Sequence, residues 1–128
     1  MKAATHDWII KAELDHLAAM DLARRRKLPL HDMVCFHCQQ AAKKYIKAVL
    51  EDCSIYFPKT HDLETLLTLL IPTHPFLTLL IPATRRLKPF GVLIHYPGND
   101  ATKAQAKKAL ADRKAIISEI RQLLGLKT

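Results

Sequence analysis

The segment "HDMVCFHCQQAAKKYIKAVLEDC" (residues 31–53) decides the fold, because it reads as the longest helix of the chain. Its apolar residues recur at three- and four-residue steps, the spacing of one helix face. They are Val34, Cys38, Ala41, Ala42, Tyr45, Ile46, Val49 and Leu50. The opposite face carries Gln40, Lys43, Lys44 and Lys47, and its three lysines are predicted to be solvated.

The two ends of the chain are also predicted to be helical, over residues 6–26 and 103–124. Thr5 or Asp7 is expected to cap the first helix, and Thr102 the last. Gly125 is expected to close the last helix. The residues expected to turn the first helix toward the core are Trp8, Ile10, Leu14, Leu17, Ala18 and Leu22.

The middle of the chain predicts shorter elements. "YFPKTHDLETLLTLL" (56–70) opens a third helix, with Thr60 as the expected N-cap and Leu63, Leu66, Leu67 and Leu70 in the core. A fourth helix over 75–87 is interrupted at Pro82. A short apolar element over 89–95 ends in the turn signal "YPGND". The hexamer LTLLIP occurs at 67–72 and again at 77–82, which is too few copies for a solenoid.

Composition agrees with an all-α protein. The chain of 128 residues has 3 glycines and 7 prolines, and its β-branched residues are scattered. We therefore predict one domain, 1–128, folded as an antiparallel up-and-down helical bundle. A bundle of this size buries a modest fraction of its surface, so association with a second copy is expected.

The net charge of +8 favours an anionic partner such as RNA, a nucleotide or an acidic protein. A lysine-rich surface without a ligand is the alternative. The densest cluster, Arg24-Arg25-Arg26-Lys27, also suits the cationic last turn of a helix.

The three cysteines, Cys35, Cys38 and Cys53, predict neither a disulfide framework nor a metal site. The C-x-x-C pair has no second ligand pair to complete a tetrahedron, so these thiols are expected in the core. No glycine-rich phosphate loop is present, and no cofactor is expected. The odd number of cysteines favours a reducing cytoplasm. No signal peptide is expected, because Lys2 is followed by polar residues, and no membrane span, because the apolar region 66–82 is broken by prolines.

Metal-free RNA cleavage needs a group that exchanges protons near neutral pH and a fixed cation for the phosphate. His95 with Arg85, Arg86 or Lys88 is the candidate catalytic set, and His95 with Arg86 or Lys88 is the preferred choice. On a continuous helix Arg86 would lie opposite His95, whereas Lys88 would share its face. Catalysis by Arg86 would then require a bend in the chain or a second subunit.

Three stretches together resemble the HEPN domain family. "FHCQQAAKKYIKAVL" (36–50) resembles the family's Gln-Gln-Ala-Ala signature, and "THDLETLL" (60–67) resembles the segment that follows it. "HYPGNDAT" (95–102) resembles its "RYP" region before the last helix. The resemblance implies a four- or five-helix bundle, usually a homodimer, with a role involving nucleotides or RNA. It also implies a minimal nucleotidyltransferase partner in a toxin–antitoxin-like pair.

The sequence departs from the ribonuclease branch of that family, in which an arginine precedes a histidine by a short spacer. Lys88, Pro89 and Phe90 stand where that arginine is expected, and His95 stands where the "RYP" branch has arginine. We therefore favour a nucleotide- or nucleic-acid-binding accessory protein. A metal-independent endoribonuclease toxin and a non-catalytic interaction module are the alternatives.

The candidate nucleotide- or phosphate-binding residues are Lys43, Lys44, Lys47, Arg85, Lys88, His95 and Tyr96. Each has a structural alternative: the lysines as a solvated face, His95 as a helix-end residue and Tyr96 as an interface aromatic. Gln39 and Gln40 lie on the long helix, and one of them is predicted to approach the core or the dimer seam as a hydrogen-bonded amide that fixes helix register, with ligand contact as the alternative. His61 is expected to belong to the capping region of the third helix.

Overall fold

The computed structural model describes residues 1–92, 94 and 96–128, and these residues form helices without any strand. The α-helices are α1 (Ala3–Ala23), α2 (His31–Asp52), α3 (Leu63–Thr68), α4 (Ile81–Leu87) and α5 (Lys103–Leu123). Two short 3-10 helices, η1 (Pro75–Leu80) and η2 (Lys88–Gly91), flank α4. The predicted all-α bundle is confirmed.

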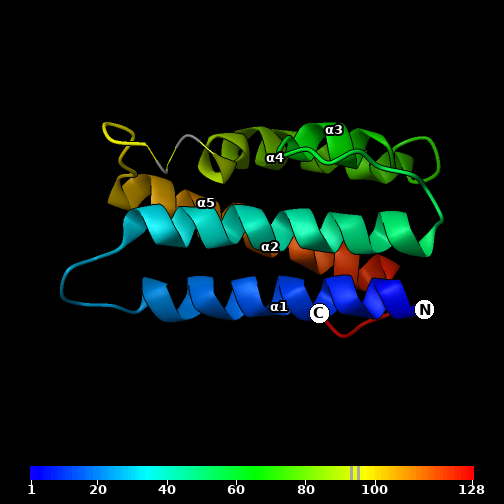
Figure 1. Cartoon of the computed structure of the whole chain (residues 1–128), viewed down its shortest axis with the longest axis horizontal. Coiled ribbons are helices and arrows are strands. Elements are labelled where there is room, and N and C mark those ends of the chain that lie inside the picture. The colour runs from blue at the N-terminus through cyan, green and yellow to red at the C-terminus, as the bar shows by residue number, and fades with distance from the viewer. Residues whose placement is uncertain (93, 95) are drawn as a thin grey trace.

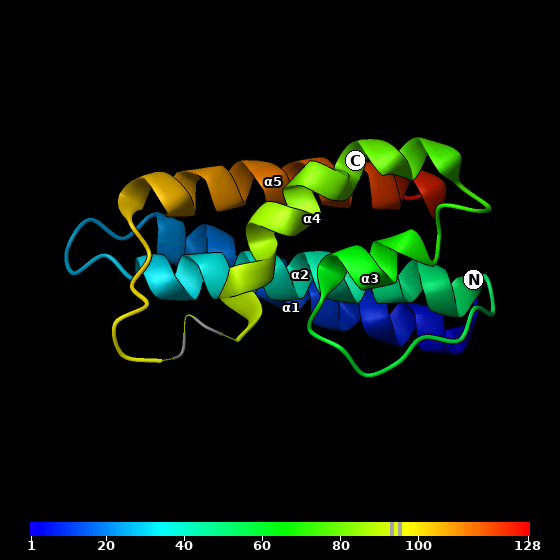
Figure 2. The same cartoon turned by 90° about the horizontal axis from the view of Figure 1, so that it is seen from above.

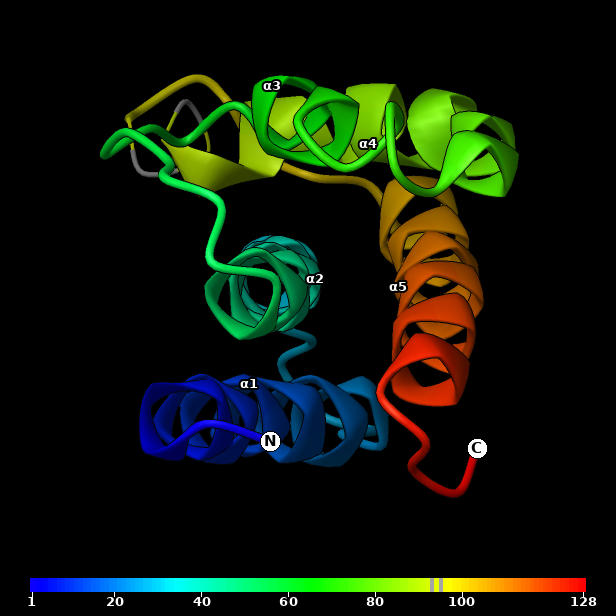
Figure 3. The same ribbon diagram turned by 90° about the vertical axis from the view of Figure 1, so that its right-hand side faces the viewer.

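The bundle is built around α2. Antiparallel α1 lies beside it, α5 crosses it in the same general direction, and α3 and α4 lie over the side away from α1 (Figure 1). Seen end-on, α2 is central, with α1, α5 and the α3–α4 layer on three of its sides (Figure 3). From above, α4 runs obliquely over the bundle and ends near the middle of α2 (Figure 2).

The central position of α2 explains why nearly its whole circumference is buried. Tyr45, Ile46 and Leu50 are completely buried. On the opposite face Gln40, Lys43 and Lys47 are also buried, so the prediction of a solvated lysine face was wrong for Lys43 and Lys47. A helix enclosed by its neighbours buries the stems of its long polar side chains along with its apolar ones.

The orientation of α1 also corrects the sequence analysis. Ile10, Leu14 and Leu17 are 58 %, 58 % and 56 % exposed, whereas Thr5, Ala12, Asp15 and Ala19 face α2. The small alanines allow α1 to approach α2, and Asp15 is buried because α2 supplies its partners. Lys44 Nζ and His37 Nδ1 lie 2.5 Å and 2.8 Å from its carboxylate oxygens.

The ends of α1 differ from the prediction as well. Its N-cap is Lys2, and Thr5 lies inside the helix, where its hydroxyl donates to Asp52 Oδ1 at the end of α2. The helix ends at Ala23, so Arg24 is the C-cap and the rest of the basic cluster belongs to the connection to α2.

At α5 the predicted caps are confirmed. Thr102 accepts a hydrogen bond from Gln105 N, and the Gln105 side chain accepts one from Thr102 N, which completes a capping box. Gly125 has a positive φ of 72°, the conformation that ends a helix at little cost in glycine.

Between α2 and α5 the chain forms several short helices instead of one long helix. Asp62, rather than Thr60, is the N-cap of α3; the Thr60 hydroxyl instead accepts a hydrogen bond from Asp62 N. All four leucines that the third helix was predicted to place in the core are buried: Leu63, Leu66, Leu67 and Leu70. The two copies of LTLLIP bury the same positions, Leu67 and Leu70 in one and Leu77 and Leu80 in the other. Pro82 lies in the first turn of α4, where its missing N–H costs nothing, and η1 precedes it.

No helix of the described residues combines the length and the apolar run needed to cross a membrane.

Candidate functional site

The three stretches that carried the family resemblance meet at one surface depression, which we call the motif groove. It consists of two adjoining hollows of about 500 Å³ and about 420 Å³ that share His61 and Val92. Its lining residues are Phe36, Gln40, Thr60, His61, Asp62, Lys88, Pro89, Gly91, Val92 and Tyr96. Residues from α2, from the turn before α3 and from the segment after α4 therefore form one surface.

A buried amide joins these three segments. Gln39 is completely buried; its Nε2 donates to the carbonyl of His61 at 3.2 Å, and its Oε1 accepts from Gln40 Nε2 at 2.7 Å. Gly91 lies against the same amide, so close that a Cβ at position 91 would be 2.8 Å from Gln39 Nε2. The prediction that a glutamine of this pair is a buried, hydrogen-bonded amide is confirmed by Gln39.

The groove combines aromatic surface with a cation at its rim. Phe36 and Tyr96 line the same hollow, and Tyr96 is 59 % exposed. Lys88 Nζ lies 3.2 Å from Asp62 Oδ2 in an exposed ion pair. Burial acts to raise the pKa of Asp62, but hydrogen bonds from Lys88 and from the Thr65 backbone outweigh it and hold that pKa below its usual value. Asp62 is thus a carboxylate that both caps α3 and positions Lys88.

The two predicted arginines, Arg85 and Arg86, do not line the groove but form ion pairs with carboxylates elsewhere. Arg85 Nε lies 2.5 Å from Glu64 Oε1 on the surface. Arg86 donates twice to the buried Asp112 of α5, from Nε at 2.9 Å and from Nη2 at 2.8 Å. Lys88 and Tyr96 are the predicted site residues that line the described part of the groove, while His95 lies outside the described residues.

The three predicted lysines of α2 lie beside or beyond the groove along the helix. Lys44 pairs with Asp15 of α1. Lys47 Nζ lies 5.1 Å from the ring centre of Trp8 and 5.6 Å from that of Phe57. Burial lowers the pKa of Lys47, and the charges of Lys44 and Lys59 lower it further. Lys47 is therefore a cation that lies against a pair of aromatic rings in mutual contact.

Lys43 is a buried lysine whose charge is only partly offset, by Asp15. It is 7 % exposed, and no carboxylate among the described residues forms an ion pair with it. Burial lowers its pKa to about 8, and the neighbouring charges of Lys47 and Lys44 act in the same direction. Lys43 follows Gln40 by one helical turn, so it extends the polar face of α2 away from the groove.

The cysteines of the C-x-x-C pair are core residues, as predicted. Cys35 and Cys38 are completely buried, and burial raises the pKa of each thiol to about 12. Within residues 1–92, 94 and 96–128, no three His, Cys, Asp or Glu side chains gather so that they could hold a metal ion.

Sequence reasoning missed several lining residues as members of a site. His61 was assigned to the capping region, yet it lies in both hollows. Phe36, Gly91 and Val92 were given no role. The signal that could have found these residues is their position in the sequence: Phe36 and His61 lie within family-like stretches, and Gly91 and Val92 closely precede the third.

Comparison with protein families matches the HEPN domain over residues 5–123. The match covers nearly the whole chain, so the chain belongs to the HEPN domain family. Membership supports a function related to nucleotides or RNA. Comparison with curated proteins and with solved structures gives no significant match.

Proposed function

We propose that the motif groove binds a nucleotide unit of single-stranded RNA. The observation that carries the proposal is the convergence of three separate sequence motifs on one hollow with aromatic walls. Family membership and the net charge of +8 support the same ligand class.

The chemistry of the groove suits one base and its phosphate. The exposed ring of Tyr96 and the ring of Phe36 offer a stacking surface, which accepts any base because every base has a π-face. Lys88 lies at the rim, where its ammonium can neutralise a phosphate at little desolvation cost. His61 adds a ring that can donate or accept a hydrogen bond.

We also propose that the protein acts as a homodimer through the outer face of α1, defined as Ile10, Leu14 and Leu17. These residues lie opposite the face that packs on α2 and leave three large apolar side chains in solvent. Ile10 and Leu17 stand almost symmetrically about Leu14. A twofold axis at Leu14 would therefore pair Ile10 of each copy with Leu17 of the other, which is a self-complementary contact.

The accessory role beside a minimal nucleotidyltransferase, in a toxin–antitoxin-like pair, rests on the family resemblance. The experiment that bears on it is co-purification of the chain with such an enzyme.

RNA binding is tested by fluorescence anisotropy with a short labelled single-stranded RNA at low salt in EDTA. We expect saturable binding that weakens as salt rises. Tyr96→Ala should weaken it by about tenfold, the loss of one stacked base. Tyr56→Ala is the matched control, because Tyr56 is highly exposed and lies outside the groove. No binding by the wild type, or equal losses in both variants, would contradict the proposal.

The same samples distinguish the ribonuclease alternative. The ribonuclease alternative is favoured by one observation: Lys88, a member of the candidate catalytic set, lines the groove. Gel analysis that shows RNA cleavage in EDTA, lost in His95→Ala and retained in Cys35→Ala, would establish an enzyme. Binding without cleavage would support the accessory protein.

A further inference from the structure

A second polar site lies on the opposite side of α2, between α1 and α5. At its centre is Arg113, which is only 5 % exposed. The preceding residue, Asp112, points to α4, where Arg86 occupies its carboxylate. Arg113 is therefore a buried cation beside a carboxylate that is already engaged elsewhere.

The described partners of Arg113 are neutral groups. One guanidinium nitrogen lies in hydrogen-bond contact with His16 Nδ1. Burial lowers the pKa of His16, and the charge of Arg113 lowers it further, which outweighs the opposing effect of Glu13. The imidazole is then uncharged near neutral pH, and its Nδ1 accepts the hydrogen bond while Nε2 carries the proton.

The second neutral group is the thiol of Cys38. Burial raises its pKa to about 12, although the nearby charge of Arg113 opposes that rise. No described carboxylate forms an ion pair with Arg113, and its Nε is buried without a hydrogen-bond partner. A buried guanidinium in this state lacks the anion that normally offsets the cost of removing a charge from water.

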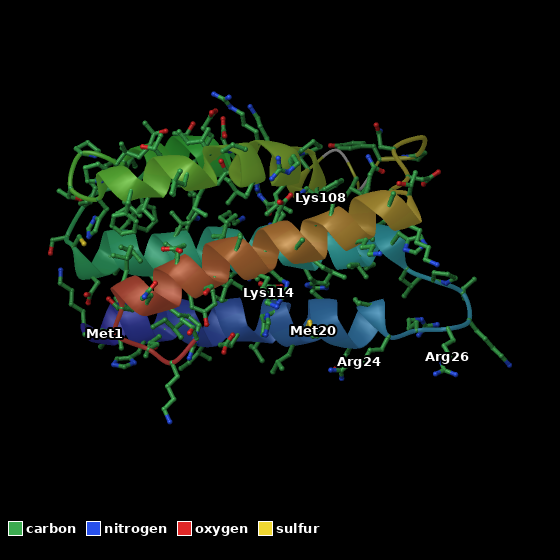
Figure 4. All side chains as sticks on the ribbon, turned by 180° about the vertical axis from the view of Figure 1, so that it is seen from behind. Met1, Met20, Arg24, Arg26, Lys108 and Lys114 are labelled. Carbon is green, nitrogen blue, oxygen red and sulfur yellow. The ribbon has the colours of Figure 1, made fainter. Side chains whose placement is uncertain are left out.

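Arg113 lines a cavity of about 360 Å³ in the seam between α1 and α5. Arg121 and Lys114 also line it, as do Thr128 and Glu13, whose carboxylate lies 3.5 Å from Arg121 Nη1. The side chains that line the cavity therefore carry more positive than negative charge. Figure 4 shows Lys114 on α5 and Met20 on α1 on either side of this seam. Met20 and Ile117 provide apolar wall.

We propose that this cavity binds a phosphate group, with Arg113 as its principal ligand. The guanidinium of Arg113, the Nε2–H of His16, the ammonium of Lys114 and the hydroxyl of Ser118 all belong to residues that line the cavity, and they are donors of the kind that phosphate oxygens accept. The cavity has room for more than the phosphate, and Met20 and Ile117 suit a small organic body. This site is separate from the motif groove and does not depend on RNA binding there.

Phosphate binding has a specific effect on His16. An anion in the cavity stabilises the imidazolium and opposes Arg113, Arg121 and Lys114, so it raises the pKa of His16. Glu13 already acts in that direction. The titration of the His16 ring, followed by NMR, thus reports occupancy of the cavity and not merely binding elsewhere on a basic protein.

The experiment titrates inorganic phosphate into the intact protein, with sodium chloride at matched ionic strength as reference. We expect a saturable calorimetric signal and an upward shift of the His16 midpoint with phosphate but not with chloride. A parallel titration with AMP distinguishes a phosphate monoester from free phosphate as the ligand of the cavity. A higher affinity for AMP than for phosphate identifies an organic phosphate as the ligand, and equal affinities identify the phosphate ion itself. Both outcomes support the site.

Arg113→Met should weaken phosphate binding by about tenfold or more, since it removes a charged hydrogen-bond donor. Lys107→Met on the same helix, outside the cavity, should leave binding unchanged. Should Arg113→Met fail to fold, Ser118→Ala and His16→Gln test the same cavity. Equal effects of phosphate and chloride, or unchanged affinity in every cavity variant, would overturn the proposal, whatever the result for RNA.

Discussion

Gly91 and Gln39 are in such close contact that position 91 has no room for a side chain. An added Cβ would lie 2.8 Å from Gln39 Nε2 and 3.0 Å from its Cδ. The amide is completely buried and hydrogen-bonded to the turn before α3, so it cannot move aside freely. The shape of the motif groove therefore depends on a glycine in η2 and an amide in α2.

Gly91→Ala should lower the free energy of unfolding by about 1–3 kcal/mol, the usual cost of overpacking. Chemical denaturation of Gly91→Ala, Gln39→Ala and the double variant forms a thermodynamic cycle. The cost of the added methyl should be smaller when Gln39 is alanine. Strict additivity of the two changes would show that the contact does not limit position 91.

Asp112→Ala should destabilise the protein by about 1.5–3 kcal/mol, because it removes two charged hydrogen bonds to Arg86 that end on a buried carboxylate. Glu64→Ala removes the partner of Arg85 from an exposed pair and should cost less than about 1 kcal/mol. Urea denaturation measures both. Similar losses in the two variants would mean that the Asp112 side chain is not buried as described.

Lys43→Met should stabilise the protein near neutral pH by about 1–3 kcal/mol, since the folded state lowers the pKa of Lys43 from 10.5 to about 8. The folded state binds this proton less well than the unfolded state. The resulting penalty is complete below pH 8 and disappears as pH rises toward 10.5. The stability difference between variant and wild type should therefore shrink over that window.

The comparison of Lys43→Met with wild type is needed because other groups titrate in the same range. Burial raises the pKa of Cys35 and Cys38 to about 12, which destabilises the folded state as pH rises above their ordinary value. Those contributions cancel in the difference between the two proteins. A difference that stays constant across the window would contradict the described environment of Lys43.

Leu14→Glu should convert the proposed dimer to monomer, because it places a charge at the centre of the outer face of α1. Sedimentation equilibrium gives the molecular mass directly. Leu79→Glu is the matched control, since Leu79 is a highly exposed leucine on η1. A monomeric wild type, or dissociation by Leu79→Glu alone, would contradict a dimer through α1.

Periodicity predicted the long helices well, because α2 and α5 carry broad apolar stripes and α5 has a local capping box. It failed on α1, where the apolar spacing is real but faces outward. The buried face of α1 includes Thr5 and Asp15, which are stable there only because Asp52, Lys44 and His37 of α2 meet them. These partners lie on another helix, so the pattern of α1 alone cannot predict that Thr5 and Asp15 are buried.

The groove was predictable in its parts but not as a surface. Tyr96 and Lys88 could be chosen from their chemistry, whereas His61 and Gly91 gain their roles from the contacts of Gln39. Arg86 illustrates the reverse case. Its charge suggested a role toward phosphate, but Asp112, distant in sequence, holds its guanidinium.

Photo-crosslinking of a 4-thiouridine-labelled single-stranded RNA, with the attachment sites mapped by mass spectrometry, tests the central claim most directly. The proposal predicts crosslinks to Phe36, His61 and Tyr96, the rings that line the motif groove. Crosslinks confined to the basic connection Arg24–Lys27, with none in the groove, would contradict it.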